Sequence, residues 1–532
     1  MGQSNNIPPA KAEPRFLEGL FTLPEPEQGA LHQLEKKLSE NLHEYLSESK
    51  VAGEIPLSEL VKKYTQYSIS EDPCFVAEQV DFLMKDVIPY CVHTGSPKFI
   101  GHMTSAIPYF LQSLSKGMVA LHQNTVKIET SRSFTFLERQ TLAQLHHLIY
   151  NEEESFYKKH MHRRTSTLGI QCSGGTVANI MALWVARNRF ISSILGEEND
   201  LGLIEALQRS GKRNLAIFVS SRGHYSLSKA ADLLGIGKAN LISVAVDNNH
   251  RLDISDLEES VKKAISKGLH PLAVVGIAGT TETGHVDPLY EIGQWCSKRN
   301  IWFHVDGAWG GAVVMSRKWK HLVEGIELAD SVVLDGHKQL YLPMGVGMLL
   351  LKNPDSADQI QHHTKYIIRE SSYDLGAKHL EGSRSGHSFL THSALNIFGR
   401  KGYELLIDRN QEMCLNFAQM IESHDSFELI TAPELNLLTY RFHPLEWKAP
   451  GKNKLEALNE LNVSLQKQQR EQGQSFVSRT QFSHPEPTGP MTTVLRSVIA
   501  NPLTRKHHLE DILAEQLRLG MKLLQELGWE KA

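Results

Sequence analysis

Lys338 gives the clearest chemical signal in this sequence, because it follows closely on the apolar run at 331–334. Lysine is seldom buried without a partner, so a lysine just beyond a buried strand suggests a functional role. When burial lowers its pKa, a lysine amine forms imines with aldehydes. His337 directly precedes it and is a candidate contact for a phosphate group. Lys338 is therefore our candidate for covalent attachment of an aldehyde.

Asp306 ends a second apolar run, in the segment HVDGAWGG. Burial of a carboxylate is unfavourable unless it meets a cation, and a protonated pyridine nitrogen would be such a cation. Ala308, two residues later, is small enough for a flat ring to lie against it. A structural or metal-binding aspartate is the competing interpretation, but no set of carboxylate or histidine ligands surrounds Asp306. A zinc site is not expected.

A possible phosphate site precedes a helical run, in the segment CSGGT that contains Gly175 and Thr176. Small residues let the backbone close around an anion, and the start of a helix presents free N–H groups and the positive end of its dipole. The spacing is neither GxGxxG nor that of a Walker loop, which disfavours dinucleotides and ATP. Taken alone, such a segment is more often an ordinary helix cap.

Two other candidates follow predicted strands. His224 comes after 215–220 and is suited to stacking on a ring, while Thr281 comes after 272–279 and is suited to bonding a ring oxygen. Each is unremarkable by itself, as a loop histidine or a polar turn. The order of all these groups along the chain, ending at Lys338, matches the parts of a pyridoxal-phosphate site. That cofactor is an electron sink, and the protein supplies orientation and charge.

The elements that must position these residues are short strands alternating with helical stretches. The predicted strands are 215–220, 241–246, 272–279, 301–306 and 331–336. This alternation predicts an α/β fold with a mainly parallel sheet covered on both faces, and ligands bind at the carboxyl ends of such strands. Three parts are expected: a helical N-terminal segment with a draped arm (1–95, with the arm at 1–28), a large cofactor domain (96–400) and a small α+β domain (401–532). In the last part we predict strands at 435–442 and 491–499, and a solvated helix at 452–474.

The composition is that of an ordinary globular chain, with 532 residues, 41% hydrophobic residues and a formal net charge of −4. No basic run points to nucleic acid or an anionic membrane. The five cysteines form no CxxC pair, which favours free thiols in a reducing compartment. The first residues lack the order of a signal peptide, and no apolar run is long enough to span a bilayer. We expect a cytoplasmic protein.

With these residues assembled, the chain resembles the group II pyridoxal-phosphate decarboxylases, over roughly residues 85–520. SVVLDGHK at 331–338 is similar to the lysine signature of that family, and HVDGAWGG is similar to its HVDAAWGG segment. LRSVIANP at 495–502 resembles a C-terminal strand of the family. Gly307 departs from the alanine that many members have, and Val177 departs from a common acidic residue.

The resemblance implies an aspartate-aminotransferase-like fold (fold type I) with a seven-stranded sheet, a homodimer with its active site at the interface, and α-decarboxylation of an amino acid. It implies roles for individual residues. Lys338 carries the cofactor, Asp306 meets the pyridine nitrogen, His224 stacks on the ring, Ala308 and Thr281 lie beside it, and Gly175, Thr176 and His337 bind the phosphate. Arg496 matches an arginine that binds a substrate carboxylate, and His102 and Asn124 resemble substrate-pocket positions. Tyr373, in a predicted lid at 370–376, is a candidate acid for the α-carbon.

Several segments, among them FIGHMTSAIP and GHVDPL, most resemble the members that convert L-aspartate to β-alanine, a precursor of pantothenate, and carbon dioxide. Glutamate, cysteine sulfinate and 2,4-diaminobutyrate remain alternative substrates. Transamination or C–S cleavage on the same cofactor is the main enzymatic rival. A regulator that binds the cofactor without catalysis is the rival from another class, and a nucleotide-binding module is a third idea. The regulator would carry a DNA-binding module and lack the full lysine, aspartate and histidine set, and neither feature is seen.

Overall fold

A seven-stranded sheet forms the centre of the large part of the molecule. The computed structural model describes residues 13, 30–48, 50–362, 372–449, 451, 453–484 and 489–531. The strand order is β1-β7-β6-β5-β4-β2-β3, with β6, β5, β4, β2 and β3 parallel and β7 antiparallel to both its neighbours. The bounds are β1 Gly169–Cys172, β2 Asn214–Ser220, β3 Leu241–Val244, β4 Leu269–Ile277, β5 Trp302–Asp306, β6 Ser331–Asp335 and β7 Gly347–Leu351.

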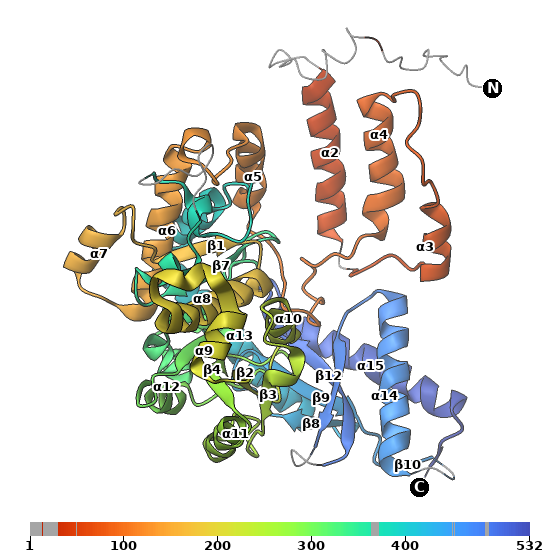
Figure 1. The fold of residues 1–532 in the computed structure, drawn as a ribbon. Helices are drawn as coiled ribbons and strands as arrows, with labels where there is room; N and C mark the ends of the chain where they lie inside the picture. Colours follow the sequence, from red (N-terminus) through yellow and green to blue (C-terminus); the bar gives the residue numbers. More distant parts are fainter. Residues whose placement is uncertain are drawn as a thin grey trace.

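Helices cover both faces of this sheet, because its central strands are apolar on both sides. Alternate residues of the strands enter two separate cores, as Phe218 and Val219 of β2 illustrate. One core is closed by α8 (Gly175–Leu195), α9 (Gly202–Ser210) and α10 (Tyr225–Leu233). The other is closed by α6 (Ser133–Tyr150), α11 (Ile254–Ser266) and α12 (Leu289–Ser297). The predicted α/β class and mainly parallel sheet are confirmed (Figure 1).

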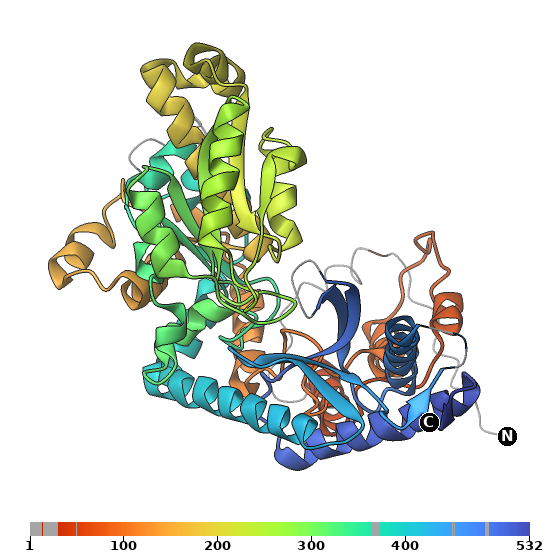
Figure 2. The ribbon, with the colours of Figure 1, turned by 90° about the horizontal axis from the view of Figure 1, so that it is seen from below.

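The C-terminal part has its own antiparallel sheet, in the order β11-β12-β9-β8, and a third apolar core. Its strands are β8 Phe427–Thr431, β9 Leu437–Phe442, β11 Ser478–Ser483 and β12 Met491–Val498, with a short pair β10 Trp447–Lys448 and β13 Glu530–Lys531. The helix α13 (Ser388–Glu422) runs from the large part to the small one, as Figure 2 shows. It has non-helical dihedral angles at Gly399, one residue before the predicted boundary at 400. The three-part division itself remains a prediction.

The helix predicted at 452–474 is present as α14 (Lys454–Gln472), but it is not simply solvated. Ala457, Leu458, Leu461 and Leu465 are buried in the small-domain core, against α15 (Lys506–Glu526) and β12. These residues form a narrow apolar stripe with helical spacing. It was overlooked in the sequence because Lys, Glu and Gln residues surround it. The prediction of a solvated helix was therefore wrong for one face.

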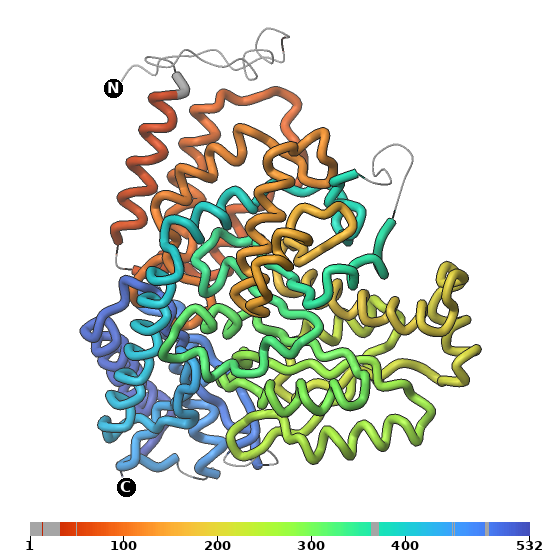
Figure 3. The backbone as a smooth tube through the Cα atoms, turned by 90° about the vertical axis from the view of Figure 1, so that its left-hand side faces the viewer, coloured from red at the N-terminus to blue at the C-terminus, as the bar shows by residue number. Residues whose placement is uncertain are grey.

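The N-terminal helices extend to one end of the molecule, beyond the large sheet (Figures 1 and 3). They are α2 (Ala30–Ser47), α3 (Leu57–Lys63) and α4 (Val76–Phe82). Farther along the chain, α5 (Tyr109–Leu121) and α7 (Glu154–His160) lie with the large part, near α6 (Figure 1). Lys37 and Asp81 join α2 to α4 with an N–O distance of 2.5 Å. The predicted arm at 1–28 lies outside the described residues, apart from Glu13. None of the described helices is both long and apolar enough to cross a membrane.

A buried ion pair holds the segment around Arg384 against α6. Arg384 donates from Nη1 and Nη2 to the two carboxylate oxygens of Glu138 on α6, at 2.8 and 2.5 Å. The side chain of Glu138 is 1% exposed and that of Arg384 is 10% exposed. Removing one member of such a pair leaves the other charge buried without compensation.

We expect Glu138→Gln to lower the free energy of unfolding by about 3 kcal/mol, because Arg384 stays charged and buried. Urea denaturation followed by circular dichroism measures this change. The matched control is Glu154→Gln, which breaks the exposed pair with Lys158 and should cost less than about 1 kcal/mol. Equal effects of the two substitutions would contradict the prediction.

Candidate active site

A cavity of about 350 Å³ opens at the carboxyl ends of the parallel strands. Its size lies within the range of roughly 300–1,000 Å³ that is usual for cofactor sites. All eight residues predicted to bind the cofactor line it, although they come from five different segments: Gly175, Thr176, His224, Thr281, Asp306, Ala308, His337 and Lys338. The sheet brings them together, because successive parallel strands end at the same edge. Their assigned roles remain predictions.

Lys338 lies in the turn after β6, where Asp335 holds its amine. The distance from Lys338 Nζ to Asp335 Oδ2 is 3.0 Å, and the Lys338 side chain is 21% exposed. Asp335 Oδ1 is buried without a hydrogen-bond partner. The carboxylate of Asp335 therefore holds the Lys338 amine at the cavity wall through Oδ2. Its Oδ1 is left without a hydrogen bond. Sequence reasoning missed Asp335, which reads as the polar end of a strand.

Asp306 ends β5 as a buried carboxylate, 6% exposed. Its Oδ2 accepts a hydrogen bond from Asn179 Nδ2 at 2.9 Å, and its Oδ1 accepts one from the Ala308 amide at 3.2 Å. No lysine, arginine or histidine forms an ion pair with it in the described part of the chain. Its negative charge therefore remains available for a cation that enters the cavity.

Asn179 connects Asp306 to two histidines, and sequence reasoning did not find it. Its Oδ1 lies 2.9 Å from His304 Nε2, and its Nδ2 donates to Ser226 Oγ at 3.0 Å. Burial lowers the pKa of His304 to about 4, so this imidazole is neutral at pH 7. Asn179 lies four residues after Gly175 on α8, on the helix face that meets the cavity. The four-residue spacing from Gly175 is the sequence feature that could have identified Asn179 as a residue of the site.

His224 is the N-cap of α10 and belongs to the same network. Its Nδ1 accepts from the Ser226 amide at 3.3 Å and lies 2.8 Å from Ser226 Oγ. Because Nδ1 is an acceptor, the proton of the neutral ring is on Nε2. Burial lowers the pKa of His224, and the charge of Asp306 opposes this. The structure thus holds a neutral, oriented imidazole at the wall of the cavity.

The start of α8 forms the floor of the predicted phosphate site. Gly174 has a φ of +151°, and residues 173–177 line the cavity. A Cβ added at Gly175 would lie 2.8 Å from Asp335 Oδ2, so only glycine fits between the helix and that carboxylate. The first amides of an α-helix have no acceptor within the helix, and here they border a cavity.

Three predicted substrate-binding residues, His102, Arg496 and Asn124, do not line the cavity of Lys338. His102 lies in an adjoining apolar pocket that shares His337 with the cavity, and its Nδ1 is 3.0 Å from Thr104 Oγ1. Arg496 on β12 is largely buried, and this lowers its pKa to about 10. Asn124 binds Ser383 and the amide of Arg384, and it lines neither pocket.

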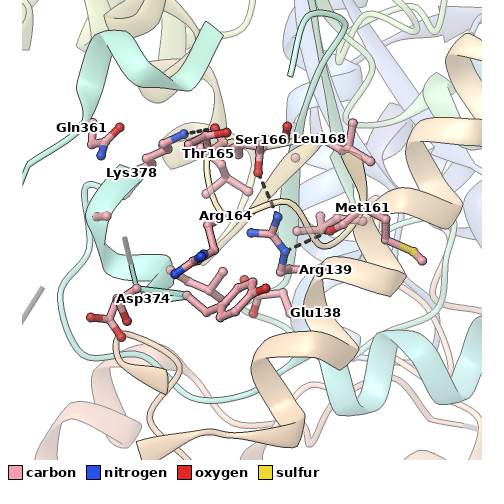
Figure 4. A pocket seen from close by; sticks show the side chains of 18 of the residues that line it. Glu138, Arg139, Met161, Arg164, Thr165, Ser166, Leu168, Gln361, Asp374 and Lys378 are labelled. Carbon is pink, nitrogen blue, oxygen red and sulfur yellow. Dashed lines mark hydrogen bonds between the residues drawn. The ribbon is translucent and has the colours of Figure 1, made fainter. Parts of the chain in front are cut away.

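Tyr373 lies in a different, smaller cavity of about 90 Å³ in this chain. Its ring packs against Phe136 and lies 6.0 and 5.8 Å from the guanidinium carbons of Arg139 and Arg164. Figure 4 shows this cavity, with Arg139 bound to the carbonyls of Met161 and Ser166. Residues 370 and 371 of the predicted lid lie outside the described residues. The role of Tyr373 remains a prediction.

Comparison with known proteins places this arrangement in a family. The family model described as "Pyridoxal-dependent decarboxylase conserved domain" matches residues 62–443. Aspartate 1-decarboxylase from Aliivibrio fischeri is 50% identical over 515 residues, covering 94% of this chain and 93% of that protein. Cysteine sulfinic acid decarboxylase from Mus musculus is 26% identical over 456 residues, covering 84% and 86%. The crystal structure of mouse CSAD in apo form has a TM-score of 0.80 at 24% identity, covering 92% of this chain and 99% of that one.

A seven-stranded α/β fold with a lysine, an aspartate and a glycine-containing helix start at one sheet edge defines a pyridoxal-phosphate enzyme of fold type I. The chain belongs to the pyridoxal-dependent decarboxylase family. It is an enzyme, and its cofactor is pyridoxal phosphate. The resemblance predicted from the motifs is confirmed.

The residues of the cavity fit this cofactor. Asp306 offers a buried carboxylate without an ion-pair partner in the described chain, which suits a protonated pyridine nitrogen. The glycines at 174 and 175 and the start of α8 suit a phosphate. Lys338 brings a primary amine to the same cavity.

Proposed function

We propose that this enzyme removes the α-carboxylate of L-aspartate as carbon dioxide and releases β-alanine. The main support is its 50% identity to an aspartate 1-decarboxylase over nearly the whole of both chains. When bound, pyridoxal phosphate supplies an electron sink for the pair of electrons left at the α-carbon. Glutamate, cysteine sulfinate and 2,4-diaminobutyrate are the alternative substrates, and the likeness to cysteine sulfinic acid decarboxylase supports the second of them.

The chain's own residues divide the work. Lys338 would hold the cofactor covalently through its amine, which lies at the cavity wall. Asp306, fixed by Asn179, keeps a proton on the ring nitrogen. His224, fixed by Ser226, packs as a neutral ring against the cofactor. These hydrogen bonds are set before substrate arrives, so little reorganisation is needed during the reaction.

Arg496 is the proposed ligand for the second carboxylate of the substrate. A guanidinium binds a carboxylate with two parallel hydrogen bonds, which fixes direction as well as charge. The Nε of Arg496 is buried without a hydrogen-bond partner. Among the residues that the structure describes, no acid forms an ion pair with Arg496. An uncompensated arginine of this kind favours an acidic substrate.

We further propose that the enzyme is a cytoplasmic homodimer with its active site at the interface. Large apolar side chains are exposed near the N-terminal end, including Leu57 (68%), Val61 (69%) and Tyr109 (83%). Exposed apolar side chains of this size favour an interaction surface. Since Tyr373 lies outside the Lys338 cavity of its own chain, its proposed role as the acid requires a site shared between subunits or a movement of the chain around it. The five unpaired cysteines suit a reducing compartment.

The test of the substrate is a comparison of carbon dioxide release from L-aspartate, L-glutamate, cysteine sulfinate and 2,4-diaminobutyrate by the purified holoenzyme. We expect kcat/KM for L-aspartate to exceed that for L-glutamate by at least about tenfold, because one additional methylene in a fitted pocket costs about 1–3 kcal/mol. β-Alanine is identified by mass spectrometry. Formation of a keto acid instead would identify a transaminase, and the absence of turnover with all four would overturn the proposal.

A further inference from the structure

His304 is a fully buried, titratable residue to which the division of work above gives no part. It lies on β5 two residues before Asp306, so the two side chains face the same side of the sheet, which α8 covers. Each of its ring nitrogens has one hydrogen-bond partner. Trp302, two residues earlier on the same face, belongs to the same group of hydrogen bonds. A row of polar side chains therefore runs beneath the sheet edge and ends at the Asp306 carboxylate.

The positions of the protons in this row follow from what each group can donate, starting at Trp302. An indole nitrogen can only donate, so Trp302 Nε1 donates to Ser331 Oγ at 2.9 Å. The hydroxyl proton of Ser331 is then available to His304 Nδ1, 2.8 Å away. Ser331 lies directly opposite His304 on β6, so the register of the sheet holds this pair together. Because the imidazole of His304 is neutral, its single proton is on Nε2.

Asn179 on α8 accepts the hydrogen bond that this proton makes. His304 Nε2 lies 2.9 Å from Asn179 Oδ1, and a carbonyl oxygen can only accept. Both hydrogens of the Asn179 amide are then free for other partners: one meets Asp306 Oδ2 at 2.9 Å and the other meets Ser226 Oγ at 3.0 Å. If the amide were turned over, its oxygen would face the negative carboxylate of Asp306, and a hydrogen bond to a charged group would be lost.

We propose that His304 is a positioning residue, which fixes the direction of the Asn179 amide and thereby holds Asp306 ionised and in place for the protonated ring nitrogen of the cofactor. This rests on the proposed role of Asp306. His304 itself does not line the cofactor cavity, so it acts only through Asn179, which does. The second hydrogen of Asn179 goes to Ser226, whose hydroxyl lies 2.8 Å from His224 Nδ1, so the same amide also supports that histidine.

The test compares pyridoxal phosphate with its deaza analogue, in which a C–H group replaces the ring nitrogen. The analogue cannot be protonated at that position, so it gains nothing from the charge of Asp306. The dissociation constants of both compounds are measured on the full-length protein, freed of cofactor, by titration calorimetry. The constant for the analogue divided by that for pyridoxal phosphate, called the cofactor ratio below, reports the contribution of the ring nitrogen. No substrate is involved, so the result does not depend on which amino acid the enzyme decarboxylates.

Three variants change the proposed row of hydrogen bonds, and a fourth is the control. His304→Phe keeps a ring of similar size but removes both polar atoms. His304→Gln keeps an N–H donor for Asn179, and Ser331→Ala removes the hydroxyl that fixes which nitrogen of His304 carries the proton. His146→Phe is the matched control, because His146 is also fully buried, with both ring nitrogens bonded and its pKa lowered by burial to about 4. It lies on α6 and does not line the cavity.

We expect the wild type to have a cofactor ratio well above one. His304→Phe should lower this ratio by about tenfold, the effect of losing one hydrogen bond to a charged group. His304→Gln should stay within about twofold of the wild type, because it keeps the donor. Ser331→Ala should lie between the two. His146→Phe should lower the melting temperature but leave the ratio unchanged, since a purely structural loss weakens the binding of both compounds equally.

The inference is overturned if the wild type has a large cofactor ratio that His304→Phe leaves unchanged, or if His146→Phe lowers the ratio as much as His304→Phe does. It is also overturned if His304→Gln behaves like His304→Phe, because the donor would then not be the feature that matters. If His304→Phe does not fold, Ser331→Ala and His304→Gln still test it through their different expected ratios. A wild-type ratio near one would contradict the proposed role of Asp306 and the inference with it, whereas failure to decarboxylate aspartate would count against the proposed function alone.

Discussion

We expect Lys338→Ala to reduce decarboxylation at least about a thousandfold, because Lys338 lines the cavity and is the amine that we propose holds the cofactor. In the wild type, Lys338 Nζ lies at the cavity wall, 3.0 Å from Asp335. The variant should also lose the visible absorbance band of a lysine-linked cofactor. Carbon dioxide release and the absorbance spectrum of the purified protein with added pyridoxal phosphate measure the two effects independently.

Lys338→Arg separates covalent chemistry from charge. It keeps a cation beside Asp335, so the cavity stays electrically balanced, but a guanidinium forms no such link with the aldehyde. We expect it to be as inactive as Lys338→Ala, and to melt closer to the wild type. Lys352→Ala, in which an exposed lysine is removed, should keep full activity. An absorbance band that persists in either Lys338 variant would show that another lysine carries the cofactor.

The second large effect is expected at Asp306. Asp306→Asn keeps the shape of the side chain but removes the charge that holds a proton on the ring nitrogen. Since the electron sink depends on that proton, kcat should fall by at least about a hundredfold. The cofactor should still attach to Lys338, because the lysine and the phosphate cup are unchanged. Stopped-flow absorbance would show an intact cofactor band together with slow release of carbon dioxide.

Asp330→Asn is the matched control for this substitution. Asp330 is a partly buried aspartate at the opposite edge of the same sheet, where it accepts a hydrogen bond from the Phe303 amide at 2.8 Å. It stands just before β6, whereas Asp306 ends β5, so the two differ mainly in which edge they occupy. Asp330→Asn should affect stability but leave kcat nearly unchanged. If both substitutions lowered kcat equally, the charge at Asp306 would not have the role proposed for it.

The fold and most of the cofactor cavity could be predicted from the sequence for a local reason. Apolar runs such as 331–334 report strands, and a residue placed just after a parallel strand arrives at the common carboxyl edge whatever the details of packing. Lys338, Asp306, His224 and Thr281 were identified in this way, and they meet in one cavity. The strands β1 and β7 were missed, although they are as long as β3 and β5, and β7 is not followed by a residue that the chemical argument singled out.

Only the tertiary structure decided which side chains support these residues. Asn179, Ser226 and His304 come from a helix, a helix and a strand, and their joint contact depends on how α8 and α10 sit on the sheet. The same holds for Arg222, whose partners Glu282 and Phe482 belong to different domains.

The tertiary structure also separated residues that the motifs had grouped. Tyr373 lies in the cavity of Arg139 and Arg164, and Asn124 is occupied by Ser383, so neither lies at the Lys338 cavity of its own chain. The sequence by itself determined which chemistry gathers at the sheet edge, because strand ends are a local property of the chain. Which charged side chains are paired depends on distances between remote segments, and these arise only when the domains pack.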